Sequence, residues 1–283
     1  MTVVQQKGNQ GTNAFNTQRT PSPFIWSDCP IDGLINGTVE GIFFHDDFLT
    51  SAFTVPTTEA NCGVYKGFSS TGGVMTQASD ATAAASAFGA ISFGSDGDDE
   101  GASLATVPLP FRLSGPNATA SARTGKFWFE CRVKTSSISD TIADLYVGLA
   151  DQMTLSATVP ITATAGTLAD ENLVGFHRLG TDGDYFDVKY KADGVTAVTV
   201  ASDAQAIVAD TYVKLGMKYD PADNHYIRFY GNGIEIGSKQ IPAAAGTDFP
   251  NDVQMGLVIA ILNAAAGSPT FTLDWWRAAQ LGA

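Results

Sequence analysis

Residues 125–134 read GKFWFECRVK, and apolar and polar side chains alternate along them. Successive side chains of a β-strand point to opposite faces of the sheet, so this alternation predicts a strand. One of its faces should be buried and the other should point outward. The inward set is Phe127, Phe129, Cys131 and Val133, and the outward set is Glu130, Arg132 and Lys134.

Residues 229–234, FYGNGI, predict a tight β-hairpin. Asn232 and Gly233 separate two alternating runs, and this pair suits a primed turn in which φ is positive at both central positions. Short runs of the same kind follow one another from Gly41 onward, and no long helix is expected. Further strands are expected near residues 41–49, 72–77, 88–93, 102–107, 144–150, 173–178, 184–191, 195–201, 212–219, 253–261 and 270–277.

So many short strands predict an all-β protein, a two-sheet antiparallel jelly-roll sandwich over residues 41–283. The composition agrees, because charged residues make up only 16% and Gly contributes 29 residues. Surface helices normally use Glu and Lys freely, and this chain does not.

Charge excludes one class of partner. The formal net charge is −13, which would repel a nucleic acid, and no cluster of Lys and Arg offsets it. Residues 1–20 are polar and lack the apolar core of a signal peptide, and no apolar run reaches membrane-spanning length. We therefore expect no membrane partner, and synthesis in a cytoplasm without export by the usual route.

Residues 1–40 differ from the rest of the chain. The first twenty are rich in Gln, Asn, Gly and Thr, and prolines then interleave with Phe24, Ile25 and Trp26. Apolar residues among prolines suit an extended arm that docks on a neighbouring subunit and has no core of its own. The alternative is a flexible tail.

The three cysteines predict neither a disulfide framework nor a metal site. Cys131 lies on the inward face of its strand and is expected to be a reduced core thiol. Cys29 and Cys62 would be able to pair, but nothing in their spacing requires it.

Three segments resemble the concanavalin A-like (laminin-G-like) jelly roll over roughly residues 43–279. They are FHDDF at 44–48, IRFYGNG at 227–233 and LDWWRAAQ at 273–280. Other cues are most similar to the version of this domain in tailed-bacteriophage virion proteins: GGV at 72–74, an acidic turn at 96–100 before ASL, FWFE at 127–130 and VGLAD at 147–151. The resemblance implies the fold more strongly than any function, because this fold serves lectins, glycosidases and capsid proteins.

Catalysis is not expected. Glycosidases of this fold place carboxylates on one strand face in the pattern E-x-D-x-x-E, which is absent here. The histidines, His45, His177 and His225, are far apart in sequence, and no cofactor is expected. Asp96, Asp98 and Glu100 are weak candidates for a Ca²⁺ site, and a solvated turn is the favoured interpretation.

Four aromatic residues are candidates for stacking on a sugar or for covering an interface: Trp128, Tyr146, Tyr185 and Trp276. Aromatic residues in a sandwich more often belong to the core or pair across strands.

The resulting hypothesis is a non-enzymatic virion protein, a decoration or cement protein on the exterior of a phage capsid. Its partners would be the major capsid protein and copies of itself, with a trimer as one arrangement. The alternative is a carbohydrate-binding module or a receptor-binding tail component on the same fold.

Overall fold

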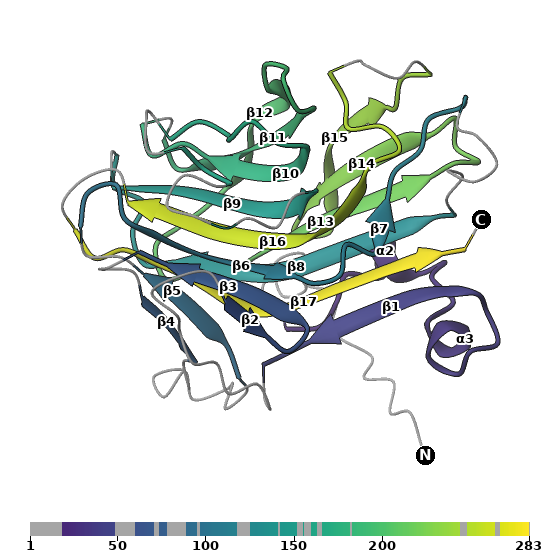
Figure 1. Cartoon of the computed structure of the whole chain (residues 1–283), viewed down its shortest axis with the longest axis horizontal. Coiled ribbons are helices and arrows are strands. Elements are labelled where there is room, and N and C mark those ends of the chain that lie inside the picture. Colours follow the sequence, from purple (N-terminus) through teal and green to yellow (C-terminus); the bar gives the residue numbers. More distant parts are fainter. Residues whose placement is uncertain are drawn as a thin grey trace.

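Two antiparallel sheets build the molecule in a computed structural model (Figure 1). The structure describes residues 19–48, 60–70, 74–77, 89–94, 97–117, 125–140, 142–151, 155, 160–162, 166–181, 183–243, 248–263 and 267–282. The predicted strand near 72–77 is therefore described only as 74–77.

The alternating stretch at residues 125–134 forms strand β8 of sheet A. The order of this sheet is β15 (Ile234–Gln240), β14 (Tyr226–Gly231), β13 (Val213–Asp220), β8 (Phe127–Thr135), β17 (Thr270–Leu281), β5 (Ile91–Gly94) and β4 (Val74–Gln77), and β1 (Gly41–Asp46) pairs with β17.

Sheet B lies over sheet A. Its order is β12 (Val198–Ala206), β11 (Tyr185–Lys191), β10 (Leu173–Arg178), β9 (Ala143–Ala150), β16 (Gln254–Asn263), β6 (Gly101–Thr106), β3 (Tyr65–Ser69) and β2 (Ala60–Cys62), and β7 (Phe111–Arg112) pairs with β16. The predicted all-β, two-sheet antiparallel sandwich is confirmed.

The predicted hairpin is also confirmed. Strand β14 ends at Gly231 and β15 begins at Ile234, and the two residues between them have φ values of 50° and 79°. The Asn-Gly pair therefore adopts the left-handed conformation that a primed turn requires. Strand β12 spans residues 198–206, so the strand predicted at 195–201 starts and ends too early in the sequence.

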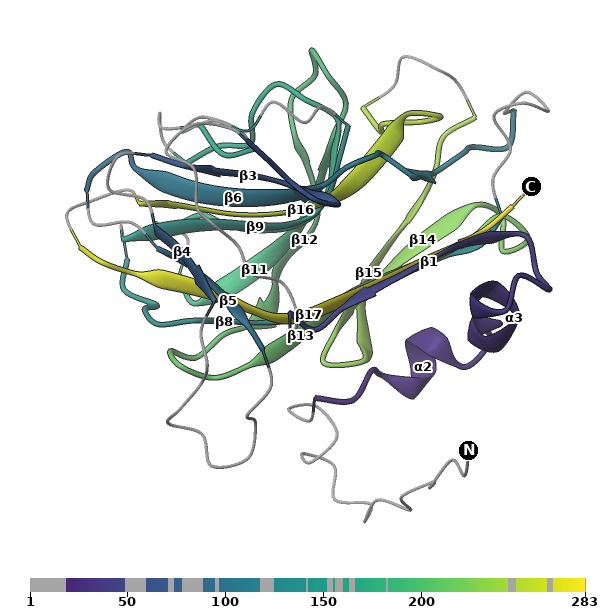
Figure 2. The same cartoon turned by 60° about the horizontal axis from the view of Figure 1, so that its bottom comes forward.

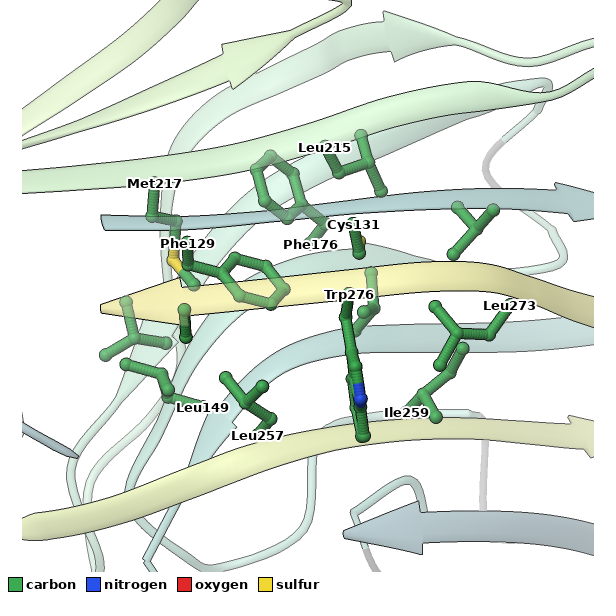
Figure 3. Close-up of a cluster of buried hydrophobic side chains, with 14 of the residues drawn as sticks. Phe129, Cys131, Leu149, Phe176, Leu215, Met217, Leu257, Ile259, Leu273 and Trp276 are labelled. Atoms are coloured by element: carbon green, nitrogen blue, oxygen red, sulfur yellow. The ribbon is translucent and has the colours of Figure 1, made fainter. Parts of the chain in front are cut away.

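The core lies between the sheets and contains the inward set of β8 (Figure 3). Phe129 and Cys131 from β8 face Leu149 and Leu257 from sheet B, and Trp276 fills the space between the sheets. Cys131 is buried with a free thiol, as expected. Full burial of such side chains contributes about 1.5–3 kcal/mol each before the entropy of ordering is counted.

The N-terminal segment, residues 19–40, lies on the outer face of sheet A, on the side away from sheet B (Figure 2). It contains two short helices, α2 (Pro23–Trp26) and α3 (Ile31–Ile35). The expectation of an extended arm is wrong for these residues. Proline is well suited to the first turn of a helix, and here Pro23 begins α2 while Pro30 occupies the N-cap position of α3. No helix in the described part of the chain is long and apolar enough to cross a bilayer.

Candidate functional site

Strands β10 and β11 are neighbours in sheet B (Figure 1). A row of polar side chains from both strands lies on the outer face of this sheet. His177 of β10 is paired in register with Asp187 of β11. Lys189 lies two residues further along β11, and its Nζ is 3.0 Å from Asp187 Oδ2 and 3.4 Å from His177 Nδ1. These three side chains therefore share one face of the sheet.

Tyr185, the first residue of β11, extends this row to the start of the strand. Strand alternation places it on the same face as Asp187 and Lys189, two and four residues away. Its side chain is 41% exposed, whereas Asp187 and His177 are buried. An accessible aromatic ring therefore stands beside a set of fixed hydrogen-bonding groups.

His177 is held as a neutral imidazole. Burial lowers its pKa to about 4, and the ammonium of Lys189 adds to the effect. Nε2 is 2.9 Å from the carbonyl oxygen of Gly166, and a carbonyl can only accept. The proton consequently lies on Nε2, and Nδ1 accepts from Lys189.

Asp187 is fixed as firmly as its neighbour. The backbone N–H of Asp203 on β12 donates to Oδ1 at 2.9 Å, while Lys189 occupies Oδ2. On the adjoining strand β9, Asp144 accepts from the N–H of Gly180 at 2.6 Å and is buried. Both carboxylates are therefore held by hydrogen bonds from the protein itself.

Three of the four aromatic candidates are not at the surface. Trp128, Tyr146 and Trp276 are fully buried, and only Tyr185 is exposed. The Trp128 indole donates to Asp28 Oδ1 at 3.0 Å beneath the N-terminal segment, and the Trp276 indole donates to the Tyr65 hydroxyl inside the core. The prediction of accessible rings was wrong for these residues, because covering segments and the opposite sheet bury them.

Tyr146 is buried for a related reason. It lies on the outer face of sheet B, where its hydroxyl donates to the carbonyl of Leu149 at 2.9 Å. Leu155, Ile161 and Leu168, from the connection between β9 and β10, pack against it in one apolar cluster. Tyr146 is therefore buried although it lies on the outer face of β9.

The predicted docking residues of the N-terminal segment divide in the same way. Ile25 and Trp26 are buried, whereas Phe24 is 79% exposed. The expectation that Ile25 and Trp26 dock on another subunit is corrected, because they pack on the chain's own sheet A with Trp128, Tyr230 and Ala279. Residues 1–18 lie outside the described residues.

A buried carboxylate that sequence reasoning missed holds this segment in place. Glu130, predicted to face outward, does so but is fully covered. The Ser22 N–H and the Trp26 indole N–H both donate to its Oε2 at 2.8 Å. Burial raises the pKa of Glu130, although these hydrogen bonds and Lys214 oppose the rise. A single Glu opposite a distant Ser-Pro segment gives no recognisable signal in the sequence.

The acidic turn does not gather into a recognisable ion site in the described residues. Asp96 lies outside them, Asp98 is exposed, and a Cβ on Gly97 would lie 2.6 Å from Glu100 Oε2, so the Glu100 side chain folds over the turn. Across the described ranges no three His, Cys, Asp or Glu side chains are grouped to hold a metal. Cys29 has a free thiol, and the Cys62 side chain lies outside the described set.

Neither a protein-family model nor a curated protein matches the sequence. In structure, the chain is similar to an endo-1,3-beta-glucanase from Streptomyces sioyaensis, with a TM-score of 0.50 and 9% identity over 85% of this chain and 96% of that one. The chain has a concanavalin A-like fold. This fold is shared by carbohydrate-binding and carbohydrate-active proteins.

Two other structures with this sandwich are similar to the chain. A protein of unknown function, SO2946 from Shewanella oneidensis MR-1, has a TM-score of 0.54 and 11% identity over 89% of this chain and 94% of that one. The carbohydrate recognition domain of Emp46p has a TM-score of 0.46 and 16% identity over 66% and 82% of the two chains. Identities this low establish the fold alone.

Proposed function

We propose that this protein is a non-catalytic glycan-binding protein, and that the outer face of sheet B around Tyr185 is its contact surface. The observation that carries the proposal is the exposed ring of Tyr185 beside the fixed polar row of Asp187, His177 and Lys189. An aromatic ring offers a flat apolar face to a sugar, and a few oriented polar groups give specificity.

The way the polar row is held supports a binding role for this surface. A retaining glycosidase needs two carboxyl groups about 5–5.5 Å apart, one of them free to act as a nucleophile. Asp187 is bound to Lys189 and to a backbone N–H, and neutral His177 donates to a carbonyl. These groups orient one another, so they suit recognition better than proton transfer.

Binding to a glycan array and to a soluble β-1,3-glucan tests the proposal. Tyr185→Ala should weaken binding about tenfold or more, since loss of one stacked ring costs at least ~1.4 kcal/mol. Phe24→Ala is the matched control, because it removes an exposed ring from α2, which lies on the outer face of sheet A, and should not change glycan binding. Equal binding by wild type and Tyr185→Ala would refute the assignment, and release of reducing sugar would refute the non-catalytic role.

A second candidate function, attachment to a phage capsid as a decoration protein, is favoured by Phe24. This ring projects from α2, and the next two residues anchor that helix to sheet A. A rigidly held apolar side chain at the surface is a typical interface feature. Cosedimentation with capsids that lack the protein should then be lost in Phe24→Ala and kept in Tyr185→Ala. The opposite pattern would favour the glycan role.

A further inference from the structure

Glu171 is a buried carboxylate that no part of the proposed binding surface uses. It lies directly before β10 and is only 8% exposed. Its Oε2 is buried and has no hydrogen-bond partner among the described residues. A buried carboxylate without a partner is costly in its ionised form, which makes it a site where a proton can control the structure.

Two acidic residues act on Glu171. Asp151 follows β9 and Asp193 lies in the turn after β11, and both oppose ionisation of Glu171. Asn172 ties them together, because its Nδ2 donates to Asp151 Oδ2 at 2.6 Å and its Oδ1 accepts from the N–H of Asp193 at 3.1 Å. These bonds fix the Asp151 carboxylate and the backbone of Asp193 beside Asn172, the residue that follows Glu171.

The nearby cation on this side gives Glu171 little help. Lys191 of β11 favours ionisation of Glu171, but its Nζ is paired with Asp170 Oδ1 at 3.1 Å. Asp170 also accepts from the N–H of Gly194 at 2.8 Å. On β9, the phenol of Tyr146 lies close enough for the Glu171 charge to contribute to raising its pKa.

Glu171 belongs to a segment that covers apolar residues of sheet B. Segment 166–172 includes Leu168, which is 6% exposed and bridges to Ile161. Both pack on Tyr146, Val258 and other apolar side chains of the sheet. The Thr162 N–H donates to the Thr167 carbonyl and the Ala169 N–H donates to the Pro160 carbonyl. These backbone hydrogen bonds hold the segment to residues 160–162 and belong to neither sheet.

We propose that ionisation of Glu171 detaches segment 166–172 from the outer face of sheet B and uncovers the apolar strip beneath it. When the carboxyl group is protonated, it carries no charge and the segment rests on Tyr146 and Val258. Once ionised, it adds a charge beside Asp151 and Asp193 while its buried Oε2 has no hydrogen-bond donor among the described residues, so moving the carboxylate toward water lowers the free energy. Burial, followed by those two carboxylates, raises the pKa of Glu171 to about 7. The inference stands whether or not a glycan binds.

Amide hydrogen exchange of the full chain, corrected for intrinsic rates and followed by mass spectrometry between pH 5.5 and 8.5, tests the proposal. Protection of peptides covering 166–172 should fall at least tenfold across this range, with most of the fall below pH 7 and little further change above it. Peptides from β16 should stay protected, which separates local release from global unfolding. A flat profile for segment 166–172 in the wild type overturns the proposal.

Two variants make the test specific. Glu171→Gln keeps the shape without the charge, and its protection should not change with pH. Asp170→Asn removes the adjacent, exposed carboxylate but keeps Glu171, and it also frees Lys191 from its ion pair with Asp170. Since Lys191 favours ionisation of Glu171, the pH dependence should persist in this variant but be smaller than in the wild type. Equal pH dependence in the wild type and Glu171→Gln would also overturn the proposal.

Discussion

The two outer faces of the sandwich are covered in different ways. The N-terminal segment is held to sheet A by the apolar packing of Ile25 and Trp26 and by charged and polar contacts: Glu130 accepts two N–H groups, and Asp28 contacts Trp128, Lys126 and Lys218. Segment 166–172 rests on sheet B mainly through Leu168 and its apolar neighbours. Beneath the first cover, Glu130 Oε2 accepts two N–H groups, whereas in the second the buried Glu171 Oε2 has no hydrogen-bond partner among the described residues.

Glu130 and Glu171 show what that difference does. Burial raises the pKa of both. Around Glu130, N–H donors and Lys214 favour the charged form, whereas Asp151 and Asp193 add to the burial effect at Glu171. A buried acid thus fastens one cover and can loosen the other, depending on the groups that face it.

The largest expected effect is loss of the sheet A cover in Trp26→Ala. Truncation removes a buried indole and one of the two donors to Glu130, so the segment should lose about 3–5 kcal/mol of docking free energy. Hydrogen exchange of residues 22–31 and denaturant unfolding measure it. Phe24→Ala is the control and should change stability by less than about 0.5 kcal/mol. Unchanged protection in Trp26→Ala would show that Glu130 and Trp26 do not hold the segment.

On sheet B, Gly166→Ala should be the most damaging small change. Gly166 has φ of +60°, and an added Cβ would overlap the Asp144 carboxylate. Gly194→Ala is a matched control, since Gly194 has φ of +73° with nothing within 4 Å. The control should cost about 1 kcal/mol for the left-handed backbone, and Gly166→Ala about 1–3 kcal/mol more. Equal melting temperatures for the two variants would contradict the close packing of Gly166.

Glu171→Gln should stabilise the protein at alkaline pH and not at acidic pH. The folded-state pKa is raised from 4.5 to about 7, so the folded state binds more protons within this window and the wild type loses stability as pH rises through it. Above pH 7 the variant should be more stable by about 1–2 kcal/mol, because relaxation of the segment reduces the ~1.4 kcal/mol expected per pKa unit. Urea denaturation at pH 4 and pH 8.5 provides the comparison. A constant difference at both values would mean that the charge of Glu171 is not responsible.

The smallest effect is expected at the exposed rim of the sheet A cover. Lys126 pairs with Asp28 at 3.2 Å and with Asp220 at 2.6 Å, and all three side chains are partly exposed. Lys126→Ala should therefore cost about 0.2–1 kcal/mol at low salt and less at high ionic strength. Thermal melting at two salt concentrations checks this. A loss as large as that of Trp26→Ala would mean that the rim, and not Glu130, anchors the segment.

Local patterns in the sequence predicted the sandwich well. The alternation at residues 127–133 and the Asn232-Gly233 turn were sufficient, because strand faces and hairpin turns depend on neighbouring residues. The candidate site was predicted only in part. Tyr185 was identified, but Trp128 and Tyr146 occupy outer-face positions that distant segments cover. Alternation assigns a side chain to a face and does not show whether another segment covers that face.

By itself, the sequence determined the stranded class, the core set of β8 and the hairpin at 231–234, since these depend on side-chain period and backbone preference over a few residues. Tertiary structure alone decided that Ser22 and Trp26 contact Glu130, more than a hundred residues away. It also decided that Asp151 and Asp193 act on the buried carboxyl group of Glu171. Those contacts depend on how the segments outside the strands fold over the two sheets. The access of water to each charged group follows from that packing.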